Sequence, residues 1–508
     1  MDSVATLVAF LAAGTTLIFG CERFSSNRGD SLYCICDSNY CDKVPSISKP
    51  SDDSRYSLVS SNKEGLRFYV TNGTFIGRLH GNVPLRITIN KGQTFQNISG
   101  FGGALTDSTG FNIKSLTNDV QDKLLGSYFG YDSIEYNMVR VPIGTTDFSP
   151  RPYSYAMSEY DVGLERFSLT SEDNVYKIPN LKKISSLSLR NLKLIASPWT
   201  PSPWMKTQAT WTGKSILRRE YWQTWANYFV KFFQAYEKNN FKFWALTPQN
   251  EPRVAFSTIR IPNMGWEAED QREWITRFLA PNLKSSKLDY LKIIIGDGSR
   301  QILPDFVRPI LNSREAKDVI SGIAVHSYFN NNTALNFLDR IHTLYPDKFL
   351  LSTENSAILQ GNQEVKLGSW SRAEDYANSI INNLSHWVTG WIDSNMALDL
   401  QGGPNWLNRF VDSPIIVNAS ANAFYKQPTY YVMGHFSKFV PPDSKRINSI
   451  KRGSAKIKSI AFSTPDNATV IILLNPYRNR REVLIEDVIK GSARVILPAK
   501  SINSMIYW

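Results

Sequence analysis

The chain has 508 residues, of which 42% are apolar and 20% charged, and its formal net charge is +12. This is ordinary globular composition with ample material for a large core. The basic residues are scattered rather than gathered in one block, which argues against a nucleic-acid-binding protein. A general surface excess or contact with anionic lipids would explain the positive charge.

The first 20 residues are mostly apolar or small and carry no charge after Asp2. Such a segment at the extreme N-terminus predicts a secretory signal peptide over residues 1–20. A signal anchor is the alternative, because no basic residue precedes the apolar run. A lipoprotein site ending at Gly20-Cys21 is a third possibility, which the same lack of Lys and Arg disfavours. No later segment reaches the ~18 apolar residues of a membrane span, so no other span is expected.

All four cysteines lie within residues 21–45, directly after the predicted signal: Cys21, Cys34, Cys36 and Cys41. An even, clustered set in an exported chain predicts disulfides, with three possible pairings, and zinc binding is the alternative. Six N-x-S/T sequons agree with export. Asn383 lies inside a helical pattern and is the sequon least expected to carry a glycan. The predicted glycosylation sites are the others: Asn72, Asn97, Asn331, Asn418 and Asn467.

Alternating apolar and polar residues mark both ends of the mature chain. After a polar linker, they occupy the runs 55–61, 66–73, 75–80 and 83–90, and near the C-terminus the runs 456–464, 468–476, 481–487 and 501–508. Period-two alternation predicts antiparallel strands. We therefore expect one all-β sandwich domain built from residues 46–95 and 440–508, with a large insert between its two parts.

The insert, residues 96–439, alternates apolar runs with amphipathic helical patterns. The runs are ISGFGGALTD, YNMVRVPIG, KLIASPWT, FKFWALTPQNEP, LKIIIGD, ISGIAVHSY, KFLLSTEN and TGWIDSNMAL. Continuously apolar strands with helices between them predict a parallel sheet. Eight such units over about 340 residues match a (β/α)₈ TIM barrel. A doubly wound open sheet is the alternative, but the chain lacks a Gly-rich dinucleotide loop.

Most of these apolar runs end in a residue that can do chemistry. In a TIM barrel the carboxyl ends of the strands form the rim of the active site, so these residues would meet there. A helix cap or a turn would explain each one singly, but not the whole set. The residues are Asp107, Trp199, Asn250, Glu251, Asp297, His326, Tyr328, Glu354 and Asp393.

Two carboxylates stand out in this set. Glu251 ends the fourth expected strand and Glu354 the seventh, and strands three apart on an eight-stranded barrel face each other across its mouth. Glycoside hydrolysis needs such a pair: one acid to protonate the leaving oxygen, and one carboxylate to attack or to activate water. A separation of about 5 Å gives retention, and one of about 6.5–9.5 Å gives inversion. The sequence does not decide between these.

Further residues suit a sugar pocket. Asn250 can hold the 2-hydroxyl beside the reacting carbon. Trp199 offers an aromatic face, and Asp107 can accept from two sugar hydroxyls. His326 and Tyr328 can orient Glu354 and tune its pKa. The chain shows no tight metal-ligand spacing and no nucleotide or hydrolase loop, so we expect no metal and no cofactor.

Several of these segments resemble the glucosylceramidases, or acid β-glucosidases, of glycoside hydrolase family 30. The resemblance rests on ISGFGGALTDS, RVPIGTTDFS, SPWTPSPWMK, NEP, IAVHSY, GGPNW, VDSPI and FYKQPTYYVMGHFSKF, and covers nearly the whole mature chain. It implies hydrolysis of glucosylceramide in sphingolipid degradation by a retaining mechanism. Glu251 would be the acid/base and Glu354 the nucleophile, and Asp107, Trp199 and Asn250 would contact glucose, with Tyr328 near the nucleophile.

The resemblance also implies a small N-terminal sheet with the disulfides Cys21–Cys34 and Cys36–Cys41. It implies a lysosomal site reached through the secretory pathway, on the lumenal membrane face, with secretion as the alternative. Anionic lipids and a saposin-type activator protein would be its partners, and nucleic acid would not.

Four departures from the family put the edge of the pocket in doubt. Ser327 and Ser394 stand where the best-known members have tryptophan, and Gln249 replaces a glutamate. The order Asn408-Arg409 reverses an Arg-Asn pair, which moves a sugar-contacting asparagine. A relative that cleaves a different β-glycoside is therefore the second hypothesis. A catalytically dead glycan- or lipid-binding protein is the third, although both glutamates are present.

Overall fold

The computed structural model describes residues 20–26, 30–77, 85–328, 334–357, 364–453 and 456–508. All of the predicted signal peptide except Gly20, and the sequon at Asn331, lie outside these residues. None of the described helices is long and apolar enough to cross a membrane.

Eight parallel strands close into a barrel, as expected from the eight apolar runs. They are β6 (Gly100–Ala104), β7 (Met138–Ile143), β8 (Lys193–Pro198), β9 (Ala245–Leu246), β10 (Lys292–Ser299), β11 (Ile320–His326), β12 (Phe349–Glu354) and β13 (Val388–Asp393). Residues 241–244, FKFW, were expected to be part of the fourth strand, but β9 contains only the two residues that follow them.

One layer of the barrel interior explains why the runs are apolar throughout. Strands β7 to β13 each contribute one buried side chain to a single cluster: Met138, Ile195, Ala245, Ile294, Ala324, Leu351 and Ile392. Strand β6 contributes glycines, because a Cβ on Gly102 would lie 1.9 Å from the Met138 carbonyl oxygen. The interior is therefore a packed core that supports the carboxyl ends of the strands.

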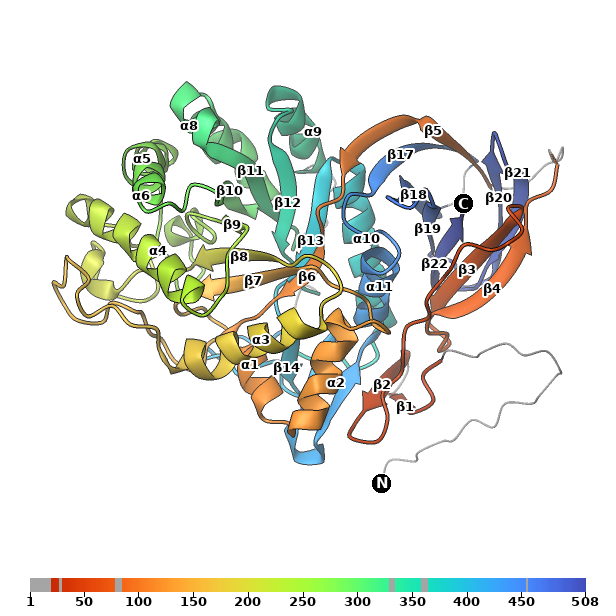
Figure 1. Cartoon of the computed structure of the whole chain (residues 1–508), viewed down its shortest axis with the longest axis horizontal. Coiled ribbons are helices and arrows are strands. Elements are labelled where there is room, and N and C mark those ends of the chain that lie inside the picture. The colour runs from red at the N-terminus through yellow and green to blue at the C-terminus, as the bar shows by residue number, and fades with distance from the viewer. Residues whose placement is uncertain (1–19, 27–29, 78–84, 329–333, 358–363, 454–455) are drawn as a thin grey trace.

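Helices surround the barrel on its outer side (Figure 1). In the described part of the chain the α-helices are α1 (Asp107–Lys114), α2 (Asn118–Phe129), α3 (Ile178–Leu187), α4 (Trp222–Glu237), α5 (Ala268–Trp274), α6 (Ala280–Ser285), α7 (Arg308–Leu311), α8 (Arg314–Val319), α9 (Leu335–Leu344), α10 (Trp370–Ser385) and α11 (Pro428–Ser437). The two longest, α4 and α10, are the helices that the amphipathic patterns at 219–240 and 372–387 indicate.

Strands from both ends of the chain form one nine-stranded sheet, as the sandwich prediction requires. Its order is β21 (Gly491–Leu497), β20 (Arg481–Asp487), β5 (Leu85–Asn97), β17 (Lys445–Gly453), β18 (Lys458–Ser463), β19 (Thr469–Asn475), β22 (Ser501–Tyr507), β3 (Arg55–Asn62) and β4 (Tyr69–Thr74). Ile76, just after β4, pairs with Ser492 of β21, so the two ends of the sheet meet around an apolar core. The exact domain bounds at 95/96 and 439/440 stay a prediction.

A five-stranded sheet holds the N-terminal segment against the barrel domain. Strands β1 (Phe24–Ser26) and β2 (Leu32–Cys36) pair with β16 (Ala423–Lys426), β15 (Ile415–Asn418) and β14 (Ala397–Asp399). The disulfides are Cys21–Cys34 and Cys36–Cys41, the pairing that the resemblance implies. Among the described residues, the one group with metal-ligand spacing contains the second of these disulfides, and no cysteine is free.

Helices α10 and α11 lie between the barrel and the nine-stranded sheet, and we call their contact with β18, β19 and β22 the seam. His435 of α11 is fully buried there, with Nδ1 2.8 Å from the Ser504 hydroxyl and Nε2 3.0 Å from the Ser61 hydroxyl. Burial lowers the pKa of His435 to about 3. The ring is therefore neutral at physiological pH and joins the two domains by hydrogen bonds without an ion pair.

Candidate active site

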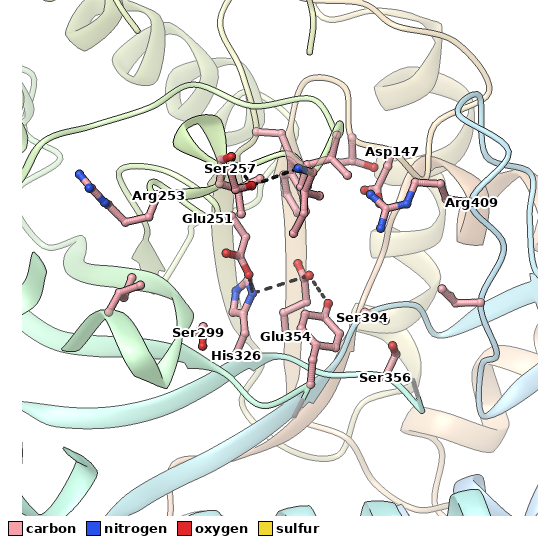
Figure 2. Close-up of a pocket in the computed structure, with 18 of the residues that line it drawn as sticks. Asp147, Glu251, Arg253, Ser257, Ser299, His326, Glu354, Ser356, Ser394 and Arg409 are labelled. Atoms are coloured by element: carbon pink, nitrogen blue, oxygen red, sulfur yellow. Dashed lines mark hydrogen bonds and ion pairs between the residues drawn. The ribbon is translucent and has the colours of Figure 1, made fainter. Parts of the chain in front are cut away.

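A cavity of about 390 Å³ opens at the carboxyl ends of the barrel strands. It contains both predicted catalytic glutamates, with His326 between them (Figure 2). Its lining combines polar and charged residues with apolar ones. The apolar residues are Phe148, Trp199, Val254, Ile259, Ile261, Ile302, Ala334 and Val411.

Glu251 reaches the cavity from the loop after β9. Its φ is +47°, in the left-handed region that residues other than glycine seldom occupy. Its backbone N–H donates to the carbonyl oxygen of Asp297 at 2.7 Å, which fixes this unusual turn. Backbone strain of this kind persists where the surroundings over-determine it, as at many functional sites.

Glu354 is the last residue of β12 and lies on the opposite wall. Arg140 of β7 donates to its Oε2, and the Tyr328 hydroxyl donates to its Oε1. The expected contact between Tyr328 and Glu354 is therefore present. A carboxylate that accepts from a guanidinium and a phenol is held in one orientation.

His326 lies between the two glutamates. Its Nδ1 is 2.7 Å from Glu251 Oε1 and 3.8 Å from Glu354 Oε1. These two carboxylate oxygens therefore lie no more than about 6.5 Å apart, the sum of the two distances. We expected His326 to orient Glu354, but its hydrogen bond is with Glu251.

The electrostatic surroundings of His326 keep its ring charged. Burial lowers the pKa of His326, but the charges of Glu354 and Glu251 and a hydrogen bond to Asp297 outweigh it and raise the pKa to about 10. Two carboxylates in one small space would repel each other, and an imidazolium between them offsets that repulsion.

Asp297 belongs to β10 and is fully buried. Its Oδ2 accepts from Arg140 at 2.8 Å and from Thr247 at 2.6 Å, and its Oδ1 accepts from Thr353 at 2.6 Å and lies 3.1 Å from His326 Nε2. Burial alone would raise the pKa of Asp297, but Arg140 and His326 hold it well below its usual range. Asp297 is therefore a buried anion with four polar partners.

Two of the predicted sugar contacts lie close to this network. The ring of Trp199 lines the cavity, with the Arg140 guanidinium 4.7 Å from its centroid. Asn250 lies behind Glu251 and is buried, and its Oδ1 accepts from Arg140 at 2.7 Å. No acceptor among the described residues bonds its Nδ2, so that amide group is free to donate to a sugar hydroxyl.

Asp107 does not line the cavity, which differs from our expectation. Its side chain is fully buried at the start of α1, where Oδ2 accepts from Ser149 at 2.6 Å and Tyr153 at 2.9 Å. Lys177 lies 3.4 Å from Oδ1. The carboxylate therefore bonds to internal partners in this structure, and its contact with a sugar stays a prediction.

The Asp107 network supports a neighbouring loop that does line the cavity. Ser149 donates to Asp107 and accepts from the backbone N–H of Thr146 at 2.9 Å, so it fixes the loop that contains Asp147. Asp147 lines the cavity, as does Arg409, whose side chain lies near it (Figure 2). Burial raises the pKa of Asp147 to about 6, the charge of Glu354 adds to this, and Arg409 opposes it.

Sequence reasoning missed Asp147 and Arg140 as members of the site. Asp147 follows the second apolar run by three residues, so a search limited to strand ends passes over it. Arg140 had a signal, because it is a charged residue in the middle of an apolar run and is 0% exposed. A buried arginine in a strand needs carboxylate partners, and here these are Asp297 and Glu354.

The departures from the family occupy different places. Ser394 and Arg409 line the cavity. Ser327 is buried outside it, beside Ser352 at 3.2 Å. Gln249 is buried behind Trp199 and donates to its carbonyl oxygen at 2.7 Å. Of the departures that the structure describes, only Ser394 and Arg409 can therefore touch a ligand in this cavity.

The sequons also divide by environment. Asn72, Asn97 and Asn467 are exposed, which is compatible with a glycan. Asn418 is half-buried, with its amide donating to Tyr425 at 2.7 Å. Asn383 is fully buried and bonded within α10, in keeping with its exclusion from the predicted sites.

Comparison with known proteins agrees with this architecture. The model of the glycosyl hydrolase family 30 TIM-barrel domain matches residues 98–440, and that of the family 30 beta sandwich domain matches residues 443–505. The chain belongs to glycoside hydrolase family 30. It is therefore a glycoside hydrolase with a barrel and a sandwich domain, as the sequence predicted.

Proteins with different names are similar to this chain in sequence or in structure. Lysosomal acid glucosylceramidase of Mus musculus is 39% identical over 484 residues, which are 94% of this chain and 93% of the mouse protein. The structure of SrfJ from Salmonella typhimurium has a TM-score of 0.83 at 25% identity, over 89% of this chain and 99% of that one. The structure of the endo-β1,6-glucanase BT3312 has a TM-score of 0.79 at 27% identity, over 90% of this chain and 99% of that one.

Proposed function

We propose that this family 30 enzyme hydrolyses the β-glucosidic bond of glucosylceramide to glucose and ceramide, with retention of configuration. The observation that carries the proposal is the pair Glu251 and Glu354 with His326 between them, whose nearest oxygens lie within about 6.5 Å. That upper limit is compatible with the about 5–5.5 Å of retaining pairs and reaches only the lower edge of the about 6.5–9.5 Å of inverting pairs.

The two glutamates would act in turn. Glu354, oriented by Arg140 and Tyr328, attacks the anomeric carbon as a carboxylate while Glu251 gives its proton to the leaving oxygen. Glu251 then takes a proton from water, whose oxygen attacks the same carbon and releases Glu354. Asn250 Nδ2 would hold the 2-hydroxyl, and Trp199 would lie against the sugar ring. Asp147 and Arg409 would bind hydroxyls at the far side of the cavity.

Two features support a lipid aglycone. The apolar residues that line the cavity include Val254, Ile259 and Ile261. These three come from the loop after β9 and can contact an alkyl chain. The relative with the highest identity quoted above is named a lysosomal glucosylceramidase. We extend from it a lysosomal location on the lumenal membrane surface. Anionic lipids and a saposin-type activator would be partners, in keeping with the net charge of +12.

The test is hydrolysis of glucosylceramide in anionic vesicles at about pH 5, with ceramide measured by mass spectrometry. We expect ceramide from the wild type and none from Glu354→Gln, and we expect a cyclitol epoxide to label Glu354 covalently. Folded wild-type enzyme that is labelled but releases no ceramide would contradict the substrate, and absence of labelling would contradict the catalytic roles.

A second candidate function rests on Ser394. Its small side chain lines the cavity and leaves space where the best-known glucosylceramidases have tryptophan. A structure similar to this chain, BT3312, is named an endo-β1,6-glucanase. The same assay with β-1,6-glucan and aryl β-xylosides decides between the two. Higher kcat/KM on one of these than on glucosylceramide would favour the second function.

A further inference from the structure

One buried carboxylate in the site takes no part in the proposed reaction steps. Asp297 contacts no cavity space, yet its side chain bonds to residues from β7, β11 and β12 and from the segment after β9. Its φ is +50°, and the register of β10 against β11 shifts between Gly296 and Gly298. A bulge of this kind re-aims a side chain, and here it turns Asp297 into the barrel.

Asp297 orients the ring of His326 toward Glu251. Because Asp297 is an anion with Oδ1 3.1 Å from Nε2, that nitrogen carries a hydrogen and donates. Nδ1, 2.7 Å from Glu251, is then the ring atom that faces the acid/base. A carboxylate that orients a catalytic-site histidine is a recurring arrangement in enzymes.

Asp297 also sets the charge of the cluster. Arg140 and His326 are positive, and Asp297 and Glu354 are negative, so these four sum to zero when Glu251 is protonated. In the glycosyl-enzyme Glu354 is a neutral ester, and the sum is zero when Glu251 is ionised. Each step of a retaining mechanism needs Glu251 in the form that leaves the cluster neutral.

We propose that Asp297 is a positioning residue that binds the Nε2–H of His326, so that Nδ1 faces Glu251, and that balances the charge around the two glutamates. Glu251 is thereby an acid while Glu354 is free and a base while Glu354 carries the sugar. The proposal rests on the roles proposed above for Glu251 and Glu354. The other titratable groups that face this cluster are Arg140 from β7, Tyr328 after β11, and Asp147 across the cavity.

The main test compares Asp297→Asn with Thr353→Val. Asn keeps the shape of the side chain and removes the charge, whereas Val removes one hydrogen bond to Asp297 and keeps the charge. Removing an anion favours the ionised form of a neighbouring acid and so lowers its pKa. In D297N we expect the alkaline limb of the kcat/KM profile on a 4-methylumbelliferyl β-glucoside to move down by about one pH unit. T353V should keep the wild-type limb.

A second substrate separates proton transfer from general damage. A 2,4-dinitrophenyl β-glucoside has a leaving group that needs no proton. We expect D297N to lose about 100-fold on the methylumbelliferyl substrate and less than about tenfold on the dinitrophenyl one. Equal losses on both substrates with an unmoved alkaline limb, or the same shifted limb in T353V, would overturn the proposal.

Nitrogen NMR of the histidine rings tests the positioning without any turnover. The chain has five histidines, so the His326 signals can be assigned by comparison with H326Q. We expect both ring nitrogens of His326 to be protonated in the wild type at pH 8, and the ring to lose its proton at a lower pH in D297N than in the wild type, because one of its hydrogen-bond acceptors has lost its charge. A neutral ring in the wild type overturns the proposal even if D297N does not fold. A wild type that hydrolyses neither aryl glucoside refutes the proposed function instead, and leaves the ring measurement as an independent test.

Discussion

The active site and the seam each contain a buried histidine, and one ring is positively charged while the other is neutral. His326 is 2% exposed and His435 is 0% exposed. Burial lowers the pKa of both. At His326 the charges of Glu354 and Glu251 reverse that effect and raise the pKa to about 10, whereas at His435 nothing opposes it and the pKa is about 3.

The difference lies in the partners rather than in the depth. His326 contacts carboxylates, so its proton is held where acid–base chemistry is needed. His435 contacts two serine hydroxyls, which satisfy a neutral ring without charging it. One residue type therefore serves chemistry at the mouth of the barrel and cohesion at its flank.

The largest expected effect comes from removing the carboxylate whose charge does most to raise the pKa of His326. Glu354→Gln should lower kcat/KM by about 10⁴-fold, close to 5.5 kcal/mol of transition-state stabilisation, because the nucleophile is lost. The pKa of His326 should also fall, toward the behaviour of His435. Aryl glucoside kinetics and ring NMR measure the two effects. Glu374→Gln at the seam is the control and should keep wild-type activity, and retained activity in E354Q would refute the assignment.

At the seam, removing the buried histidine should lower the stability of the fold and leave catalysis almost unchanged. His435→Ala removes two buried hydrogen bonds and leaves a cavity, so we expect the free energy of unfolding to fall by about 3 kcal/mol. The urea midpoint of the intact chain measures it, with aryl glucoside kcat/KM staying within about threefold of wild type. His342→Ala, at a half-exposed ring stacked on Trp387, is the matched control with a smaller loss. A large loss of kcat/KM with an unchanged urea midpoint would contradict this division of roles.

These two regions also mark how far the sequence could predict the molecule. The barrel followed from eight apolar runs of strand length, and Glu251 and Glu354 followed from their places at strand ends. Period and position along the chain are local signals, and they determine which residues reach the rim. The sandwich followed from alternation, but β17 and β21 were missed because their alternation is interrupted by charged and small residues.

The contacts of single side chains could not be predicted in the same way. Asp107 and Asp147 are both aspartates near strand ends, yet one bonds to Ser149 and Tyr153 in the interior and the other lines the cavity. The difference depends on how the loop at 145–149 folds over α1. That fold depends on partners distant in the sequence, such as Lys177, which no local pattern around Asp107 indicates.

The two histidines should give opposite pH dependences of stability. The pKa of His435 is lower in the folded than in the unfolded chain, so its contribution is present above about pH 6.5 and is lost as pH falls toward 3. Between pH 7 and pH 5 the stability advantage of wild type over His435→Gln should shrink by about 2 kcal/mol.

His326 has the opposite sign, because its pKa is raised on folding. The advantage of wild type over His326→Gln is complete below about pH 6.5 and should be lost as pH rises toward 10. Urea unfolding at pH 5, 7 and 9 measures both differences. Parallel slopes for the two variants would show that their neighbours do not set the two pKa values as described.

The smallest effect should come from an ion pair that also crosses the seam. Lys500 lies 2.9 Å from Glu374 of α10, and its side chain is 25% exposed. Partly exposed pairs contribute little, because water screens them and both side chains lose freedom. Lys500→Met should therefore lower the free energy of unfolding by no more than about 1 kcal/mol, and high salt should reduce that loss further. A loss as large as that of His435→Ala would mean that charge, and not the neutral hydrogen bonds of His435, holds the two domains together.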